Sequence, residues 1–249
     1  MTDTLLNHRT IRKYKTDPIP YEILQYILEA GTRASTTGNM QVYSIVVTTE
    51  DAIKEELSPC HFNQPMVKQA PVVLTFCADF NRFNKWCKLR GAEPGYDNFL
   101  SFFTAAIDAL LVAQNVCVAA EDAGLGICYL GTTTYMAGKI IDILELPEGV
   151  IPVTTITLGY PDEKPELTER LPLEAVVHYE KYTDYSEDEV DKHYQDKELI
   201  TTNQEFVKEN NVQSLAHVFT DVRYKRDDNI LFSKALIDVL TQQGFMNNR

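Results

Sequence analysis

The apolar positions of the chain follow two patterns, which are short β-branched runs and longer stretches with helical spacing. The runs VYSIVVTT (42–49), PVVLTFCAD (71–79) and IPVTTITLGY (151–160) are rich in Val, Ile and Thr and predict strands. The segment GICYLGTTT (126–134) predicts a short strand that continues into a loop. Because both faces of these strands are apolar, we expect helices to cover the sheet on both sides.

Helical spacing appears in four further segments. A helix is predicted to begin after Pro20, because the apolar positions of YEILQYILEAGTRAS recur four residues apart. A second helix is predicted over about 98–123, ending at Gly124, a residue that suits a helix C-terminus. The segments AGKIIDILEL (137–146) and RDDNILFSKALIDVLTQQGF (226–245) are also predicted to be helical, the last one docked on the body of the domain.

The apolar stretch 99–120 is long enough to be mistaken for a membrane span. Asp108 interrupts it, and Glu121 and Asp122 follow it at once. Placing Asp108 at the centre of a bilayer would cost about 3 kcal/mol or more. We therefore expect a helix buried inside a soluble protein, in which Asp108 is a hydrogen-bonded polar anchor.

With 249 residues, of which 44% are hydrophobic, the chain can bury a full core. After about residue 178 the composition changes, and YEKYTDYSEDEVDKHYQDKEL carries dense charge and few core residues. This segment predicts a peripheral helix or an extended arm. We expect a single domain over 1–249, in which about 178–249 form a helical C-terminal extension.

The overall charge limits the classes of partner. The formal net charge of -13 argues against binding of nucleic acid, which depends on many Lys and Arg contacts, and against an anionic membrane. The five cysteines lack the spacing of a metal site, so we expect reduced thiols and no metal. The start, MTDTLLNHRT, has no apolar region of the signal-peptide kind, which favours a cytoplasmic protein.

Against this acidic background, NHRTIRKY (7–14) gathers His8, Arg9, Thr10 and Arg12. If the segment were helical, His8 and Arg12 would share one face. Two interpretations remain open from the residues alone. One is a solvated basic turn, and the other is a site for a phosphate monoester, which needs a guanidinium, a second cation and a hydroxyl donor.

Three other segments have the same two kinds of interpretation. The loop ASTTGNMQ (34–41) either ends a helix or offers hydroxyls and backbone N–H groups to a planar polar ligand. Gly131 is either a plain bend or a point where a ligand approaches the backbone closely. Arg170, between Pro165 and Pro172, is either a solvated loop residue or a cation that a rigid loop holds toward a ligand. The sequence contains no GxSxG, Walker, HExxH or GxGxxG motif, which favours chemistry carried by a bound cofactor.

Taken together and in this order, five segments resemble the nitroreductase family of flavoproteins, in particular its NADPH-dependent flavin oxidoreductases, the oxygen-insensitive nitroreductases. They are HRTIRKYKTDPIP, ASTTGNMQ, NQPMVKQAPVVLTFCADFNR (63–82), AAEDAGLGICYLG (119–131) and LGYPDEKPELTERLP (158–172). The resemblance covers most of 4–180 and is looser beyond. It implies an α+β fold with a central mixed β-sheet flanked by helices, a C-terminal extension that wraps the partner, and a homodimer with FMN in the interface.

The resemblance implies cofactor contacts along most of the matched region. For the flavin phosphate and ribityl chain they are His8, Arg9, Thr10 and Arg12, with Arg170 as a second phosphate cation. For the ring they are Ser35, Thr36 and Thr37, from either subunit, and the backbone stretch Tyr129, Leu130 and Gly131. Gln64 corresponds to a residue that hydrogen-bonds the flavin. Thr168 stands where the family usually has lysine. The segment KENNVQSLAHVFT (208–220) offers no clear counterpart of the arginine-rich loop that helps to hold NADPH.

The function that this resemblance implies is FMN-dependent oxidation of NADPH or NADH. A small-molecule acceptor, such as a nitroaromatic, a quinone, an azo compound or free flavin, would be reduced in a ping-pong sequence. No side chain is expected to be catalytic, because flavin N5 would carry the hydride. Two alternatives are an enzyme of the same fold that reduces an activated C=C bond and a non-enzymatic flavin-binding or flavin-delivery protein.

Overall fold

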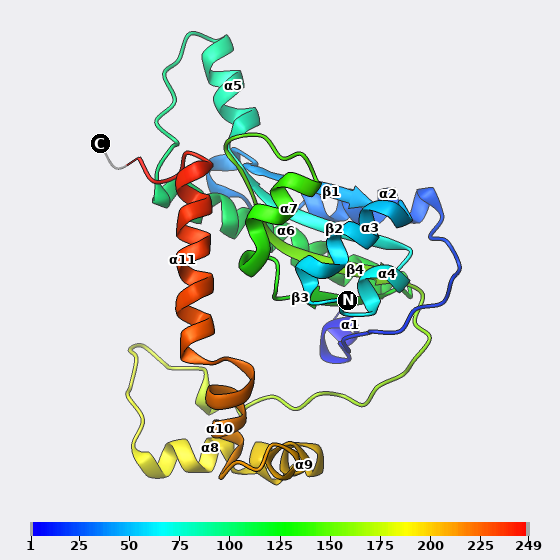
Figure 1. Ribbon diagram of the computed structural model, residues 1–249, viewed down its shortest axis with the longest axis vertical. Coiled ribbons are helices and arrows are strands. Elements are labelled where there is room, and N and C mark those ends of the chain that lie inside the picture. Colours follow the sequence, from blue (N-terminus) through cyan, green and yellow to red (C-terminus); the bar gives the residue numbers. More distant parts are fainter. Residues whose placement is uncertain (1, 248–249) are drawn as a thin grey trace. The chain divides into compact units, whose positions relative to one another are not determined.

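The computed structural model describes residues 2–247 (Figure 1). The chain forms two compact units. The first contains the residues up to Glu166 together with those from Phe232 onward, and the second is Leu167–Leu231.

A four-stranded sheet lies at the centre of the first unit. Its strands are β1 (Tyr43–Thr48), β2 (Val72–Asp79), β3 (Gly126–Leu130) and β4 (Val150–Gly159), in the order β1-β2-β4-β3. All four lie where the hydrophobic pattern predicted them, and together with the helices they confirm the α+β class.

The direction of the strands differs from the mixed sheet that we expected. Every neighbouring pair is antiparallel. Two α-helices and a 3-10 helix separate β1 from β2, so this connection can return the chain in the opposite direction, whereas a single crossover helix favours parallel strands. Parallel pairing occurs at an isolated bridge between Thr10 and Ile127, beside β3.

Helices surround this sheet and make up most of the second unit. Those of the first unit are α1 (Thr2–Leu6), α2 (Tyr21–Thr32), α3 (Asp51–Leu57), α4 (Met66–Gln69), α5 (Asn81–Leu89), α6 (Phe99–Asp122) and α7 (Ala137–Ile143). The second unit contains α8 (Glu187–Leu199), α9 (Thr201–Glu209), α10 (Leu215–His217) and the π-helical segment Val218–Arg223. The last helix, α11 (Arg226–Gln242), begins in the second unit and ends in the first.

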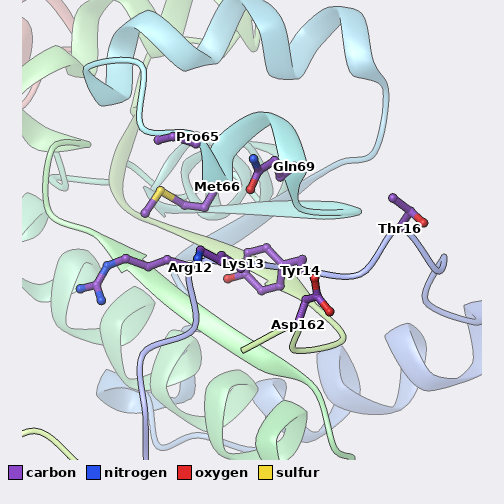
Figure 2. A pocket seen from close by; sticks show the side chains of 8 residues that line it. All are labelled: Arg12, Lys13, Tyr14, Thr16, Pro65, Met66, Gln69 and Asp162. Carbon is purple, nitrogen blue, oxygen red and sulfur yellow. The ribbon is translucent and has the colours of Figure 1, made fainter. Parts of the chain in front are cut away.

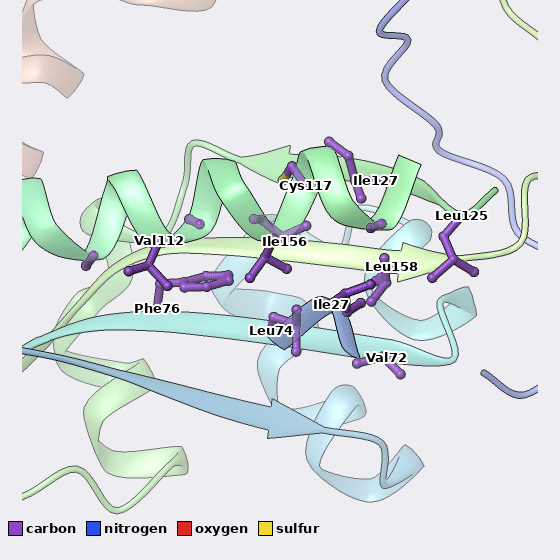
Figure 3. Close-up of a cluster of buried hydrophobic side chains, with 14 of the residues drawn as sticks. Ile27, Val72, Leu74, Phe76, Val112, Cys117, Leu125, Ile127, Ile156 and Leu158 are labelled. Atoms are coloured by element: carbon purple, nitrogen blue, oxygen red, sulfur yellow. The ribbon is translucent and has the colours of Figure 1, made fainter. Parts of the chain in front are cut away.

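The long helix α6 packs across the sheet and forms much of the core (Figure 3). Asn98 caps its first turn by accepting a hydrogen bond from the Ser101 backbone N–H at 3.1 Å. Gly124, just past its end, has a φ of +80°, as the sequence predicted for this C-terminus. The helix is long and apolar enough to span a membrane, but half of its apolar window (50%) is buried inside the protein, so it is a core helix.

Candidate functional site

The basic segment at the amino end is extended rather than helical. Helix α1 ends at Leu6, and Thr10 then pairs with Ile127 of β3. The Ile11 N–H donates to the Ile127 carbonyl at 2.8 Å. His8 and Arg12 therefore do not share a helical face, because backbone pairing to β3 holds this segment straight.

Close contact at one glycine permits this pairing. A Cβ placed on Gly126 would lie 2.6 Å from Cγ1 of Ile11, which is closer than real Cβ contacts allow. The bridge is parallel, so both chains run in the same direction from it. Arg12 and Tyr129 are thus each two residues beyond the Thr10–Ile127 pair, which brings the basic segment to the end of β3.

Two of the predicted phosphate ligands are held by contacts within the first unit. The His8 Nδ1 atom lies 2.7 Å from Oε1 of Glu121, in the last turn of α6. Nη1 of Arg9 donates to the Asn7 carbonyl at 2.9 Å. Nε of Arg9 is buried and has no hydrogen-bond partner among residues 2–247. A buried N–H without a partner is costly, so this atom indicates a place for an acceptor.

Arg12 is fixed through its backbone and not through its side chain. Oε1 of Glu163 accepts hydrogen bonds from the backbone N–H groups of Arg12 and Lys13, at 2.5 and 3.0 Å. The Arg12 guanidinium is exposed and forms no ion pair within the described part of the chain. The carboxylate of Glu163 thus holds the chain in place and leaves the guanidinium available to an anion.

A cavity of about 710 Å³ adjoins Arg12. One side is formed by Arg12, Lys13 and Tyr14, and the other includes Pro65, Met66 and Gln69 (Figure 2). In Figure 2 the Arg12 guanidinium points away from Asp162, at the opposite end of the lining. The cavity wall therefore joins the basic segment to the chain just after Gln64.

The backbone at the end of β3 is open to close approach. A Cβ at Gly131 would meet no atom within 4 Å. Leu130 is buried, and the Tyr129 hydroxyl donates to Oε1 of Gln114 at 3.3 Å. A flat ligand can therefore reach the peptide groups of this loop without a steric barrier.

The turn that leads to Gln64 contacts the Gly131 loop through His61. Gln64 follows two left-handed residues, Phe62 (φ +54°) and Asn63 (φ +55°). The residue before them, His61, has Nδ1 2.8 Å from Oγ1 of Thr132, which comes directly after Gly131. The structure thus brings together the basic segment, the end of β3 and the Gln64 turn.

The loop 34–41 with the hydroxyl residues Ser35, Thr36 and Thr37 (the hydroxyl loop) lies at another place in the first unit. Oδ1 of the buried Asp108 accepts a hydrogen bond from the Thr37 backbone N–H at 2.9 Å, whereas Oδ2 has no hydrogen-bond partner within residues 2–247, so the predicted anchor is only half satisfied. Asp108 and Glu121 are 13 residues apart on α6. At 1.5 Å per residue this separates them by about 20 Å. One chain therefore does not bring Ser35, Thr36 and Thr37 to the His8 end of the helix.

The FCADFNR motif secures the chain that follows the hydroxyl loop. Asp79 accepts hydrogen bonds from the Ser44 hydroxyl and, at 3.2 Å, from the Arg82 backbone N–H. The Arg82 guanidinium donates to the carbonyls of Gln41 and Tyr43, at 2.5 and 3.2 Å. The motif thus fixes the start of β1 just after the turn that contains the left-handed Gln41.

The remaining predicted contacts lie in the second unit. The Arg170 guanidinium donates to the carbonyls of Thr168 and Glu169, at 3.2 and 2.9 Å. In the same unit, the Arg223 guanidinium lies 4.4 Å from the centre of the Phe206 ring. The flavin contacts of Thr168 and Arg170 remain predictions.

Sequence reasoning missed His61, Glu121 and Glu163, which hold the predicted ligands in place. Glu121 is 113 residues from His8, and Glu163 is 151 residues from Arg12. A single carboxylate or imidazole in a sequence gives no sign of a partner so far along the chain. Glu121 and Glu163 do lie inside the segments that carried the resemblance, and that is the one signal by which they could have been found.

The family model described as "Nitroreductase family" matches residues 5–160. The chain belongs to the nitroreductase family. The matched region contains every predicted cofactor contact except Thr168 and Arg170.

Individual proteins and solved structures are also similar to this chain. An FMN reductase (NADPH) of Bacillus subtilis (strain 168) is 34% identical over 188 residues, which cover 75% of this chain and 76% of that protein. A crystal structure from Bacteroides fragilis NCTC 9343 has a TM-score of 0.97 at 56% identity and covers 98% of this chain and 100% of that one. The NADPH:FMN oxidoreductase from Vibrio harveyi complexed with NAD+ has a TM-score of 0.80 at 29% identity, with 99% of both chains covered.

Proposed function

We propose that this chain is an FMN-dependent NAD(P)H oxidoreductase that reduces small molecules such as nitroaromatics, quinones or flavins. The observation that carries the proposal is the open Gly131 backbone just after β3, the strand with which the segment of Arg9 and Arg12 pairs. The Bacillus subtilis relative is an FMN reductase (NADPH) and the Vibrio harveyi relative an NADPH:FMN oxidoreductase, which supports the same chemistry here.

The residues of the first unit fit the two ends of FMN. Nε of Arg9 and the Arg12 guanidinium suit the phosphate, because charge-assisted hydrogen bonds are the strong ones. The loop at Gly131 and the amide of Gln64 suit the flat, polar ring. FMN, when bound, supplies the hydride-transfer chemistry that no side chain of the site provides.

Contacts within the chain position the donors of His8 and Arg12 before a ligand binds. Glu163 holds the backbone of Arg12, and Glu121 holds one ring nitrogen of His8. The bond between Glu121 and Nδ1 leaves Nε2 of His8 to face a ligand. Donors that are already in place cost little to reorganise, so they favour tight binding of an anion.

We also propose a homodimer in which Ser35, Thr36 and Thr37 contact the flavin of the partner subunit. Within one chain this loop is about 20 Å from the His8 end of α6, so a second copy is needed to complete the site. A face of α6 is apolar and between 42% and 71% exposed; its residues are Phe99, Leu100, Phe103, Ile107, Leu110 and Leu111. Such a face suits an obligate interface, which buries about 2,000 Å² or more.

Thr168 and Arg170 are proposed as further contacts to the cofactor, with Arg170 as a second cation for the phosphate. Arg170 already donates to two nearby carbonyls, so it would have to direct its other N–H groups to a ligand. We further propose NADPH or NADH as the electron donor and a cytoplasmic location. We propose that the protein binds neither nucleic acid nor a membrane.

Turnover tests the proposal against its alternatives. Purified protein with added FMN should oxidise NADPH when menadione or nitrofurazone is present. A flavin-delivery protein would bind FMN without this turnover. An enzyme specific for activated C=C bonds would oxidise NADPH with an enone such as 2-cyclohexenone and leave both other acceptors unreduced.

A further inference from the structure

His61 is completely buried, with a relative exposure of 0%. It is the last residue of the short 3-10 helix Ser58–His61. Its Nδ1 atom lies 2.8 Å from Oγ1 of Thr132, a residue 71 positions further along the chain. A buried histidine with one long-range side-chain partner joins two segments that are otherwise separate in the sequence.

The two joined segments are those that present the proposed ring contacts. On one side, His61 is followed by the left-handed residues Phe62 and Asn63 and then by Gln64. On the other side, Thr132 directly follows Gly131. A hydrogen bond between His61 and Thr132 therefore limits how far the Gln64 amide can move from the Gly131 backbone.

Aromatic contacts connect the same two segments a second time. The Phe62 ring lies 6.2 Å from the Phe232 ring of α11. Phe232 in turn stacks on Tyr135, with ring centres 4.5 Å apart and an angle of 7° between the planes. Tyr135 belongs to the 3-10 turn Thr134–Met136, which follows the Gly131 loop. The turn that carries Gln64 is thus held from two directions.

The hydrogen bond to Thr132 has no substitute in the part of the chain that the structure describes. Burial lowers the pKa of His61 to about 4, so the ring is neutral at neutral pH and has one donor and one acceptor. Its Nε2 atom has no partner within residues 2–247. Without the Thr132 hydroxyl, both ring nitrogens would be buried and unsatisfied, which favours a reoriented ring and a displaced turn.

We propose that His61 and Thr132 are positioning residues of the flavin ring. Their hydrogen bond sets the spacing between the Gln64 amide and the Gly131 backbone, and with it the affinity for the isoalloxazine ring. This inference rests on the proposed function, because it takes Gln64 and Gly131 to be ring contacts. It concerns the ring alone, so the phosphate contacts of Arg9 and Arg12 are unaffected.

Four variants of the full-length chain test this role. Thr132→Val removes the hydroxyl and keeps the shape, whereas Thr132→Ser keeps the hydroxyl. His61→Leu removes the imidazole. The double variant His61→Leu/Thr132→Val replaces both partners by apolar groups, which is close to neutral for folding when the shapes match. Each protein, stripped of flavin, is titrated with FMN and with riboflavin, and its unfolding temperature is recorded.

We expect Thr132→Val to weaken the binding of FMN and the binding of riboflavin by the same factor, about five- to twentyfold, as for one lost hydrogen bond. Thr132→Ser should stay within about twofold of wild type. The single variants should unfold at a lower temperature than wild type. The double variant should recover most of that difference and still bind both flavins weakly. That separation of stability from affinity is what a positioning role predicts and a purely structural role does not.

Two results would overturn the inference while leaving the proposed function intact. One is a Thr132→Val protein that binds riboflavin as tightly as wild type does. The other is a double variant that regains flavin affinity together with its stability. A wild-type chain that binds neither flavin would instead overturn the proposed function, and this inference with it.

Discussion

Gly126 and Ile11 are in such close contact that a Cβ on the glycine would lie 2.6 Å from Cγ1 of the isoleucine. The contact lets the segment of the proposed phosphate ligands pair with β3 beside Ile127. The local fold and the proposed site thus both require a residue without a side chain at position 126.

Gly126→Ala should therefore affect stability and ligand binding together. Overpacking at a buried contact costs about 1–3 kcal/mol of unfolding free energy. We expect a loss in that range in urea unfolding, and weaker FMN binding because the 8–12 segment shifts. Gly95→Ala is the matched control, because a Cβ at Gly95 meets no atom within 4 Å. Equal stability of the two variants would show that β3 accommodates the methyl group.

Arg12→Ala tests the proposed phosphate contact. Loss of a charge-assisted hydrogen bond of about 1.5–3 kcal/mol should weaken FMN binding roughly ten- to a hundredfold. Riboflavin, which has no phosphate, should bind wild type and variant alike. Lys15→Ala is the control, because it removes the same charge from an exposed residue that does not line the cavity. An Arg12→Ala protein that holds FMN like wild type would exclude Arg12 from the site.

These predictions rest on a fold that the sequence specified unevenly. The four strands and the helices α2, α6, α7 and α11 lie close to their predicted positions, because their apolar positions are many and strongly periodic. The short helices α3, α4 and α5 were not predicted. They have few apolar residues, so packing against neighbours decides their conformation. The alternation of strands and helices did not determine the direction of the strands. We expected a mixed sheet, and the four strands are antiparallel.

The candidate site was predictable only in part for a related reason. The resemblance identified Arg12, Gln64 and Gly131, which occupy recognisable motifs. It did not identify the contacts that hold them, such as Glu163 on the Arg12 backbone or His61 on Thr132. Those contacts join positions 71 or more residues apart, and only the folded chain reveals them.

Ile107→Asp tests the proposed interface. Ile107 lies on the apolar face of α6 and is 42% exposed in the single chain, so an isolated monomer should tolerate aspartate there. In the proposed dimer the charge would be buried without a partner, which is strongly unfavourable. We expect wild type to be dimeric by light scattering at micromolar concentration and the variant to be monomeric with little FMN. Val47→Asp, at 38% exposure on β1, serves as the control. A wild-type monomer that retains one FMN per chain would contradict the interface.

Steady-state kinetics tests the choice of donor. Thr168 provides no cation for a 2′-phosphate, so we expect NADPH to be used with a preference over NADH below about a hundredfold in kcat/KM. Double-reciprocal plots against menadione should be parallel, because donor and acceptor use one pocket in turn. A preference above about a thousandfold would assign the discrimination to other cations, such as Arg223, Lys225 or Arg226. Intersecting lines would exclude the shared pocket.

The buried His61 should make stability depend on pH. Its pKa is lowered to about 4 in the folded state, against an ordinary value of 6.5, because burial disfavours the charged ring. Between these values the unfolded chain binds the proton and the folded chain does not, so stability is lost as pH falls from about 6.5 to about 4. The loss attributable to this group is about 3 kcal/mol at most. Urea unfolding of wild type and His61→Leu at pH 7, 5.5 and 4.5 should show a smaller decrease in the variant.

The proposed activity is tested most directly by the flavin content of the purified protein. The account predicts a yellow protein that, on heat denaturation, releases close to one FMN per chain, identified by chromatography and absorbance. After flavin removal, added FMN should restore NADPH oxidation with menadione as the acceptor. A colourless protein that takes up no FMN from excess cofactor and oxidises neither nicotinamide would contradict the account.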